Sequence, residues 1–84
     1  MHIDFHKYFM KQYKKLHQKM KDKFDERLKI FVQDSFAVEL NNHELRGKYV
    51  GCRSINITGD LRAIYEVRKD GVRFLEIDTH SHLY

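Results

Sequence analysis

The chain has 84 residues, which is enough for one domain with one hydrophobic core and too few for two. Its formal net charge is +4, and 42% of its residues are hydrophobic against 33% charged. A single cysteine, Cys52, excludes an internal disulfide and fits a reducing compartment, and no apolar run approaches the roughly 20 residues that span a bilayer.

These bulk properties predict one soluble domain over residues 1–84, located in the cytoplasm, with neither a signal peptide nor a membrane partner. Basic charge is typical of domains that bind nucleic acid, although it can also serve solubility alone. Lysines are concentrated in the first third of the chain and arginines mostly later. The arginines are the more pointed signal, because a guanidinium grips phosphate oxygens in pairs.

Residues 1–41 predict a helical scaffold. Residues 2–5 could add a short edge strand before it. Apolar side chains then recur at spacings of three and four, which predicts an amphipathic helix with lysines on its back: Phe5, Phe9, Tyr13, Leu16 and Met20. Asp22 is the predicted N-cap of a second helix, which frays near Ser35. Its expected buried residues are Phe24, Leu28, Phe31 and Val32.

A connector over residues 36–42 leads to the second half of the chain. Three of its side chains are expected to pin it to the core: Phe36, Val38 and Leu40. The turn at residues 58–60 contains Gly59, which permits a positive φ, and Asp70 followed by Gly71 is a strong hairpin signal. These turns divide residues 49–84 into three strands.

Alternation assigns the faces of these strands. In residues 49–57, Ile55 and Ile57 point one way, and Ser54 and Asn56 the other. In the second strand one face carries Leu61, Ala63, Tyr65 and Val67, and the other carries Arg62, Ile64, Glu66 and Arg68. In the third strand Leu75 and Ile77 are expected in the core. The residues expected to face away are Phe74, Glu76, Asp78 and His80.

The predicted fold is α+β, with two N-terminal helices packed on one face of a small, mainly antiparallel sheet. On this arrangement Asn56, Arg62 and His80 emerge on the opposite, open face, and Asp60 lies at the mouth of the second strand. A histidine, an aspartate and an arginine within reach of one another can catalyse phosphoryl chemistry. Alternatively, Asp60 is only a turn residue, and Arg62 forms an ion pair with a glutamate of the sheet.

Three motifs together carry a resemblance to a known family. They are Asn-His-Glu-Leu-Arg-Gly at 42–47, Ser-Ile-Asn-Ile-Thr-Gly-Asp-Leu-Arg-Ala-Ile-Tyr at 54–65, and Ile-Asp-Thr-His-Ser-His-Leu-Tyr at 77–84. With these motifs the chain resembles the RelE/ParE superfamily of bacterial toxins, and within it the YafQ-like branch, messenger-RNA interferases of type II toxin–antitoxin systems. The resemblance covers nearly the whole chain and implies the same α+β (RelE-like) layout.

The resemblance implies a ribosome-dependent endoribonuclease that cleaves messenger RNA without a metal or other cofactor. The ribose 2′-hydroxyl attacks the adjacent phosphate, which calls for a base, a positive charge on the phosphate and an acid at the departing oxygen. The implied general acid is His80, and Arg62 would stabilise the phosphate charge. His43 and Asp60 would handle the 2′-hydroxyl proton, with the division between them open.

Further residues are implied to bind RNA: Arg46, Lys48, Arg53, Asn56 and Tyr84. Tyr84 would stack on a splayed base, or else serve as a hydrophobic anchor. The implied partners are the ribosome, messenger RNA and a cognate antitoxin, whose acidic segment would wrap the basic surface in a toxin–antitoxin hetero-oligomer. His80 and His82 form a His-x-His pair, but alternation supplies no third ligand, so no metal site is expected.

The chain departs from the YafQ-like pattern at three positions. Asn56 stands where the family often has histidine, Leu61 where it often has tryptophan, and Asp78 where it usually has glycine. These differences leave codon preference and rate open. Asp78 could raise the pKa of His80 or repel a phosphate, depending on where its carboxylate points.

Two other classes of function stay open. One is a ParE-like gyrase-inhibiting toxin, which shares the fold and acts by binding protein. The other is a non-catalytic RNA- or protein-binding module. The presence of His43, Asp60, Arg62 and His80 argues against the gyrase-inhibiting class, which lacks this acid–base set.

Overall fold

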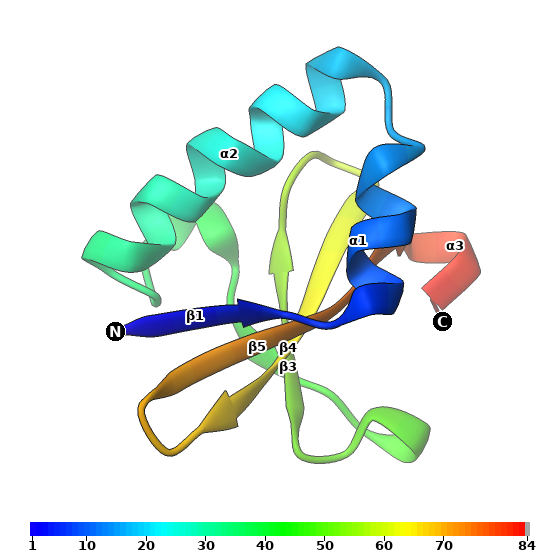
Figure 1. Ribbon diagram of the computed structural model, residues 1–84. Coiled ribbons are helices and arrows are strands. Elements are labelled where there is room, and N and C mark those ends of the chain that lie inside the picture. The colour runs from blue at the N-terminus through cyan, green and yellow to red at the C-terminus, as the bar shows by residue number, and fades with distance from the viewer. Residues whose placement is uncertain (84) are drawn as a thin grey trace.

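The computed structural model describes residues 1–83, and Figure 1 shows the arrangement of its elements. A first strand, β1 (His2–Phe5), precedes two helices, α1 (Lys7–Lys14) and α2 (Gln18–Gln33). Two short 3-10 turns, η1 (Val38–Leu40) and η2 (Gly47–Tyr49), flank the two-residue strand β2 (His43–Glu44). The chain continues through β3 (Cys52–Asn56), β4 (Leu61–Arg68), β5 (Gly71–Thr79) and a short helix, α3 (His80–Leu83).

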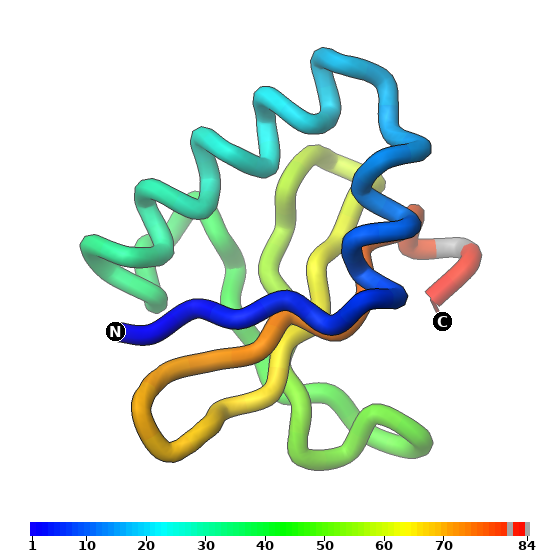
Figure 2. The backbone as a smooth tube through the Cα atoms, in the orientation of Figure 1, coloured from blue at the N-terminus to red at the C-terminus, as the bar shows by residue number. Residues whose placement is uncertain are grey.

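The strands form one five-stranded sheet in the order β1-β5-β4-β3-β2. Only the β1–β5 pair is parallel, and Figure 2 shows the N-terminal segment running along β5. Gly71 makes this approach possible, because a Cβ there would lie 1.8 Å from the backbone oxygen of His2. The predicted α+β fold is therefore confirmed, and residues 2–5 do form an edge strand.

The helix predicted from Phe5 to Met20 is wrong in its bounds. Phe5 belongs to β1, and the side chain of His6 caps the first turn of α1. Helix α1 ends at Lys14, and His17, in an extended conformation, is the N-cap of α2. Asp22 is thus not a cap but lies inside α2, where it accepts a hydrogen bond from the side chain of Gln18. The apolar stripe continues across the break because both helices contact the same core.

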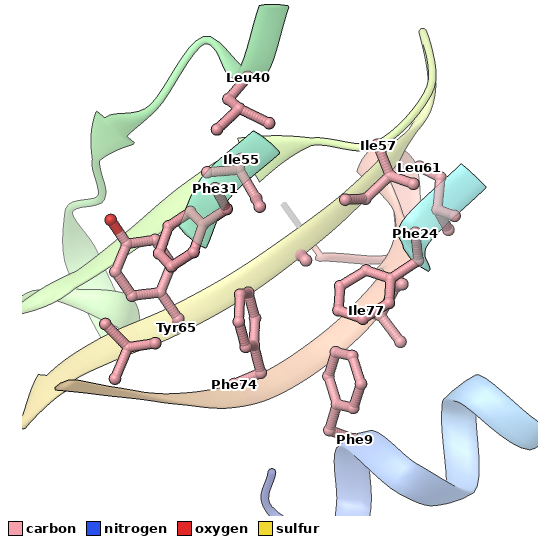
Figure 3. Packing of buried hydrophobic residues seen from close by; sticks show 12 residues of the cluster. Phe9, Phe24, Phe31, Leu40, Ile55, Ile57, Leu61, Tyr65, Phe74 and Ile77 are labelled. Carbon is pink, nitrogen blue, oxygen red and sulfur yellow. The ribbon is translucent and has the colours of Figure 1, made fainter. Parts of the chain in front are cut away.

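The main core lies between the two helices and the sheet (Figure 3). Its helical members are Phe9, Phe24 and Phe31, all almost fully buried. Its other members are Leu40 of η1, Ile57 directly after β3, and the strand residues Ile55, Leu61, Ala63, Tyr65, Val72, Phe74 and Ile77. Burial of large apolar side chains is the main stabilising term in a domain of this size. The helices therefore fix which face of the sheet is left for other roles.

Phe74 lies in the core, which contradicts the predicted alternation of β5. Its ring contacts Phe5, Phe9, Phe24, Phe31 and Tyr65. The register between β4 and β5 shifts at Ile64/Tyr65, so that Tyr65 pairs with Phe74 and Ile64 with Glu76. Leu75 is the extra residue of this irregularity, and a one-residue insertion switches the faces of everything before it.

Three other apolar residues are more exposed than predicted. Val32 of α2 is 51% exposed, and the connector leaves Phe36 64% and Val38 90% exposed. Leu40 alone of the connector's predicted anchors is fully buried. Val67, expected on the core face of β4, is also exposed, because it lies at the end of the strand near the hairpin.

The opposite face of the sheet is not open throughout. Leu45, Ile64 and Leu83 form a second small cluster there, with Tyr49 and Cys52 packed against it. Tyr49, predicted to begin a strand, lies in η2 instead, and two glycines with positive φ, Gly47 and Gly51, shape that loop. The chain after β5 therefore folds back over the sheet, and an apolar cluster covers part of this face.

Candidate functional site

The turn between β3 and β4 positions Asp60. The hydroxyl of Thr58 accepts hydrogen bonds from the backbone N–H groups of Asp60, at 3.3 Å, and Leu61, at 3.0 Å. The expected positive φ at Gly59 is absent, since the residues of this turn all keep negative φ or ordinary extended backbone. The turn is therefore stabilised by hydrogen bonds to the Thr58 side chain and does not depend on a positive φ at Gly59. The Asp60 side chain is exposed.

His80 lies next to Asp60. Its backbone N–H donates a hydrogen bond of 2.8 Å to the carbonyl oxygen of Asp60, which ties the start of α3 to the β3–β4 turn. The two residues come from positions 20 apart in sequence, and the histidine side chain is exposed. An acid–base histidine and a carboxylate residue are therefore neighbours at one end of the sheet.

Arg62 completes this group without pairing to a glutamate. Its Nη1 donates to the carbonyl oxygens of Thr58, at 3.1 Å, and Gly59, at 3.0 Å. No carboxylate within residues 1–83 forms a salt bridge with it. Carbonyl dipoles orient a guanidinium but leave its formal charge in place, so the charge stays available to an anion.

Asn56, Arg62 and Asp78 form one row across β3, β4 and β5, because Asn56 pairs with Arg62 and Arg62 with Asp78. Directly paired residues share a face, so all three lie on the face opposite the main core, and Asp78, near the free edge of β5, is also reached by Gln12 of α1. The side-chain oxygen of Asn56 is buried without a hydrogen-bond partner. The Asp78 carboxylate accepts from the Thr79 N–H at 2.8 Å and contacts Nδ1 of His82 at 3.2 Å. Its negative charge is thus directed to His82.

His43 lies on the same face but farther away. It pairs with Ser54, which pairs with Ile64. With strands about 4.8 Å apart and about 3.4 Å per residue, its Cα lies about 12 Å from that of Arg62. Its Nδ1 is 2.8 Å from the carbonyl oxygen of Asn41. A carbonyl can only accept, so Nδ1 donates and Nε2 of the neutral ring is left to accept a proton.

The structure thus brings together three of the four predicted catalytic residues, Asp60, Arg62 and His80, and sets His43 apart. Their catalytic roles stay a prediction. Burial raises the pKa of the Cys52 thiol, with the Glu66 and Glu76 carboxylates adding to the rise. Cys52 is therefore a poor nucleophile at neutral pH.

The residues predicted to bind RNA differ in exposure and in the contacts that their side chains already make. Arg46 and Lys48 are exposed, in the loop after β2. Arg53 is already engaged: its Nε donates to Asn42 at 2.7 Å, and its guanidinium lies over the ring of Phe36. These contacts join β3 to the connector, and RNA binding by Arg53 stays a prediction. Tyr84 lies outside the described residues.

No group of three or more potential metal ligands occurs among the described histidine, cysteine, aspartate and glutamate residues. Likewise, none of the helices within residues 1–83 is long and apolar enough to cross a membrane.

Sequence reasoning missed the part played by α1. The lysines, Lys15 among them, were assigned to the solvated back of the helix, yet Lys15 and His17 line one hollow with Asp60 and Thr79. The signal was present in the helical spacing of Tyr8, Lys11, Gln12 and Lys15, which puts them on one side of a helix. The spacing could not predict that this side of the helix packs beside β5.

Comparisons with known proteins identify the family and the fold of this chain. The family model described as "Bacterial toxin of type II toxin-antitoxin system, YafQ" matches residues 1–84. A YafQ mutant from E. coli has a TM-score of 0.81 at 22% identity, covering 99% of this chain and 97% of that chain. The E. coli DinJ-YafQ complex gives 0.79 at 23% identity over 99% and 97%.

A YoeB-YefM complex from Staphylococcus aureus gives a TM-score of 0.77 at 21% identity, over 95% of this chain and 97% of that chain. Identities this low show a shared fold. No curated protein matches the sequence.

Proposed function

The chain belongs to the YafQ family of bacterial toxins of type II toxin–antitoxin systems, and we propose that it acts as a ribosome-dependent endoribonuclease that cleaves messenger RNA. The observation that carries this proposal is the hydrogen bond between the His80 N–H and the Asp60 carbonyl, beside the guanidinium of Arg62. It makes neighbours of a proposed proton donor, a carboxylate residue and a positive charge that no carboxylate within residues 1–83 neutralises.

The proposed reaction needs no metal. The ribose 2′-oxygen forms a bond to the adjacent phosphorus as the bond from phosphorus to the 5′-oxygen breaks, which leaves a 2′,3′-cyclic phosphate and a 5′-hydroxyl. Asp60 takes the proton from the 2′-hydroxyl, and His80 gives a proton to the departing 5′-oxygen. Arg62 stabilises the negative charge that builds up on the phosphate.

His43 then has a different task from the one at the scissile bond. At about 12 Å from Arg62 it is roughly two nucleotide steps away, so it would bind or orient a flanking nucleotide through Nε2. Arg46 and Lys48, in the adjoining loop, would bind phosphates of the same strand or of ribosomal RNA. Tyr84 stays a candidate for stacking on a base.

We also propose that a cognate antitoxin binds the chain in the cytoplasm and holds it inactive. Two structural neighbours, DinJ-YafQ and YoeB-YefM, are toxin–antitoxin complexes. The net charge of +4 suits an acidic segment that becomes ordered on binding.

The test is expression of the full chain without its antitoxin, with growth curves and mapping of transcript 5′-ends. The wild type should stop growth and produce new ends within coding sequences. His80→Ala should abolish both, because loss of a general acid lowers a rate by about 10² to 10⁴. His82→Ala is the matched control, since it removes another exposed imidazole from the same helix and should keep both effects.

Growth arrest by His80→Ala at the wild-type level would contradict the proposal. Growth arrest without transcript cuts would point instead to a protein-binding toxin of the gyrase-inhibiting kind. Circular dichroism of both variants checks that α3 remains folded.

A further inference from the structure

A groove runs along α1 at the part of β5 that β1 leaves unpaired. It has a volume of about 350 Å³, and its lining includes Tyr8, Lys11, Gln12, Lys15, Ile77 and Asp78. We call it the α1 groove. A second hollow of about 210 Å³ follows it and contains Lys15, His17, Thr58, Asp60 and Thr79. Lys15 lines both, so the α1 groove opens directly onto the turn that carries Asp60.

Gln12 fixes the width of the α1 groove. Its Oε1 accepts the backbone N–H of Ile77 at 3.0 Å, and its Nε2 donates to Asp78 at 3.5 Å. Pairing of β1 with β5 ends at Phe74, so the edge of β5 beyond that residue has no neighbouring strand, and Gln12 forms its hydrogen bond there. The helix is thereby clamped to the strand, and the groove is preformed.

The wall formed by α1 carries two cations and one aromatic ring. Lys11 and Lys15 are exposed, and neither forms a salt bridge with a carboxylate of residues 1–83. Tyr8 is 49% exposed. Spacings of three and four residues set these side chains in a line along one face of α1. The one acidic group, Asp78, is already engaged by His82, Thr79 and Gln12.

We propose that the α1 groove binds single-stranded RNA on its way to the cleavage site. Lys11 and Lys15 bind successive phosphates, and Tyr8 stacks on an unpaired base. Basic side chains that follow a backbone and aromatic rings that accept any base are the usual elements of sequence-independent single-strand binding. The second hollow contains Asp60, so the same strand reaches one of the proposed catalytic residues. The identity of the strand as messenger RNA rests on the proposed function.

Binding can be measured without cleavage. The probe is a fluorescent single-stranded RNA of about 12 nucleotides, fully 2′-O-methylated so that no 2′-hydroxyl can attack. Fluorescence anisotropy with the full chain gives the affinity at several salt concentrations. Lys11→Ala/Lys15→Ala is the test variant. Lys29→Ala/Lys69→Ala is its control, with the same loss of charge from two exposed lysines, on α2 and in the β4–β5 turn, that line neither hollow.

Each phosphate contact on a single strand contributes a salt slope of about 0.7, which corresponds to about fivefold in affinity at 0.1 M salt. The test variant should therefore bind on the order of 20-fold more weakly, with a slope smaller by about 1.4. The control should lose less than about threefold, because its charges lie beyond direct contact. Tyr8→Ala should weaken binding by about fivefold or more, and Tyr8→Phe should not.

Equal losses in the two lysine variants would overturn the proposal, because general surface charge would then explain binding. Absence of binding by the wild type at low salt would overturn it as well, as would a Tyr8→Ala variant that binds like the wild type. An RNA duplex of the same sequence should bind more weakly, since Tyr8 needs an unstacked base. If transcript cutting is never observed but these differences hold, the groove stands and the nuclease proposal fails.

Discussion

Replacement of Phe74 by alanine tests the core that positions the site. Phe74 is fully buried and its ring contacts five other aromatic rings, so the change leaves a large cavity between both helices and the sheet. Phenylalanine-to-alanine changes in cores cost about 3–5 kcal/mol. A chain of 84 residues has about 4–13 kcal/mol in total. Phe74→Ala should therefore lose from about a quarter of the stability to all of it.

Urea unfolding followed by circular dichroism measures this loss. With a slope of about 1–1.5 kcal/mol per molar, the midpoint should fall by about 2–5 M. Leu75→Ala is the matched control, because Leu75 is only partly buried and sits at the register shift. It should cost about 1–2 kcal/mol. A larger loss for Leu75→Ala than for Phe74→Ala would refute the assigned register of β5 and restore plain alternation.

Two further predictions concern β1 and its contacts with β5. A hydrogen bond from Arg73 holds the pKa of Asp4 below its ordinary value of 3.8. The pair therefore stabilises the fold above pH 3.8, and this stabilisation is lost as the pH falls through the lowered pKa. An NMR titration should show Asp4 back at its ordinary pKa in Arg73→Ala, and no change there would contradict the assignment. Gly71→Ala should lower the free energy of unfolding, measured in urea, by at least about 1–3 kcal/mol, because the added carbon meets the backbone of β1. Gly59→Ala has open space around it and should lower the free energy of unfolding by less than about 0.5 kcal/mol. Equal losses would argue against the β1–β5 pairing.

The fold class followed from the sequence because its two strongest signals are local. Helical spacing and the Asp70–Gly71 hairpin are each decided by a few neighbouring residues. The break between α1 and α2 was predicted at Asp22 instead of after Lys14, since the apolar stripe runs straight through the true break to serve one core. Phe74 was misplaced for a related reason: the register shift depends on β4, which alternation within β5 does not contain.

The candidate site was predictable in its residues more than in its arrangement. The proximity of Asp60 and His80 depends on a backbone hydrogen bond across the sheet end, which no local pattern indicates. The assignment of Arg62 to the turn carbonyls depends in the same way on tertiary structure. The distance of His43 follows from the sheet order, with β2 at the far edge. The sequence motifs identified these residues, and the tertiary structure determines which of them lie close together.

The central claim is that Asp60, together with Arg62 and His80, cleaves RNA by attack of the 2′-hydroxyl. The most direct test is cleavage of a labelled messenger RNA on programmed ribosomes by the purified chain, with chemical analysis of the new ends. We predict 2′,3′-cyclic phosphate and 5′-hydroxyl ends, and a loss of about 10² or more in rate for Asp60→Asn, which keeps the backbone carbonyl that binds His80. Asp70→Asn, in the other turn, should cleave like the wild type. Ends bearing a 5′-phosphate, or full activity of Asp60→Asn, would contradict the claim.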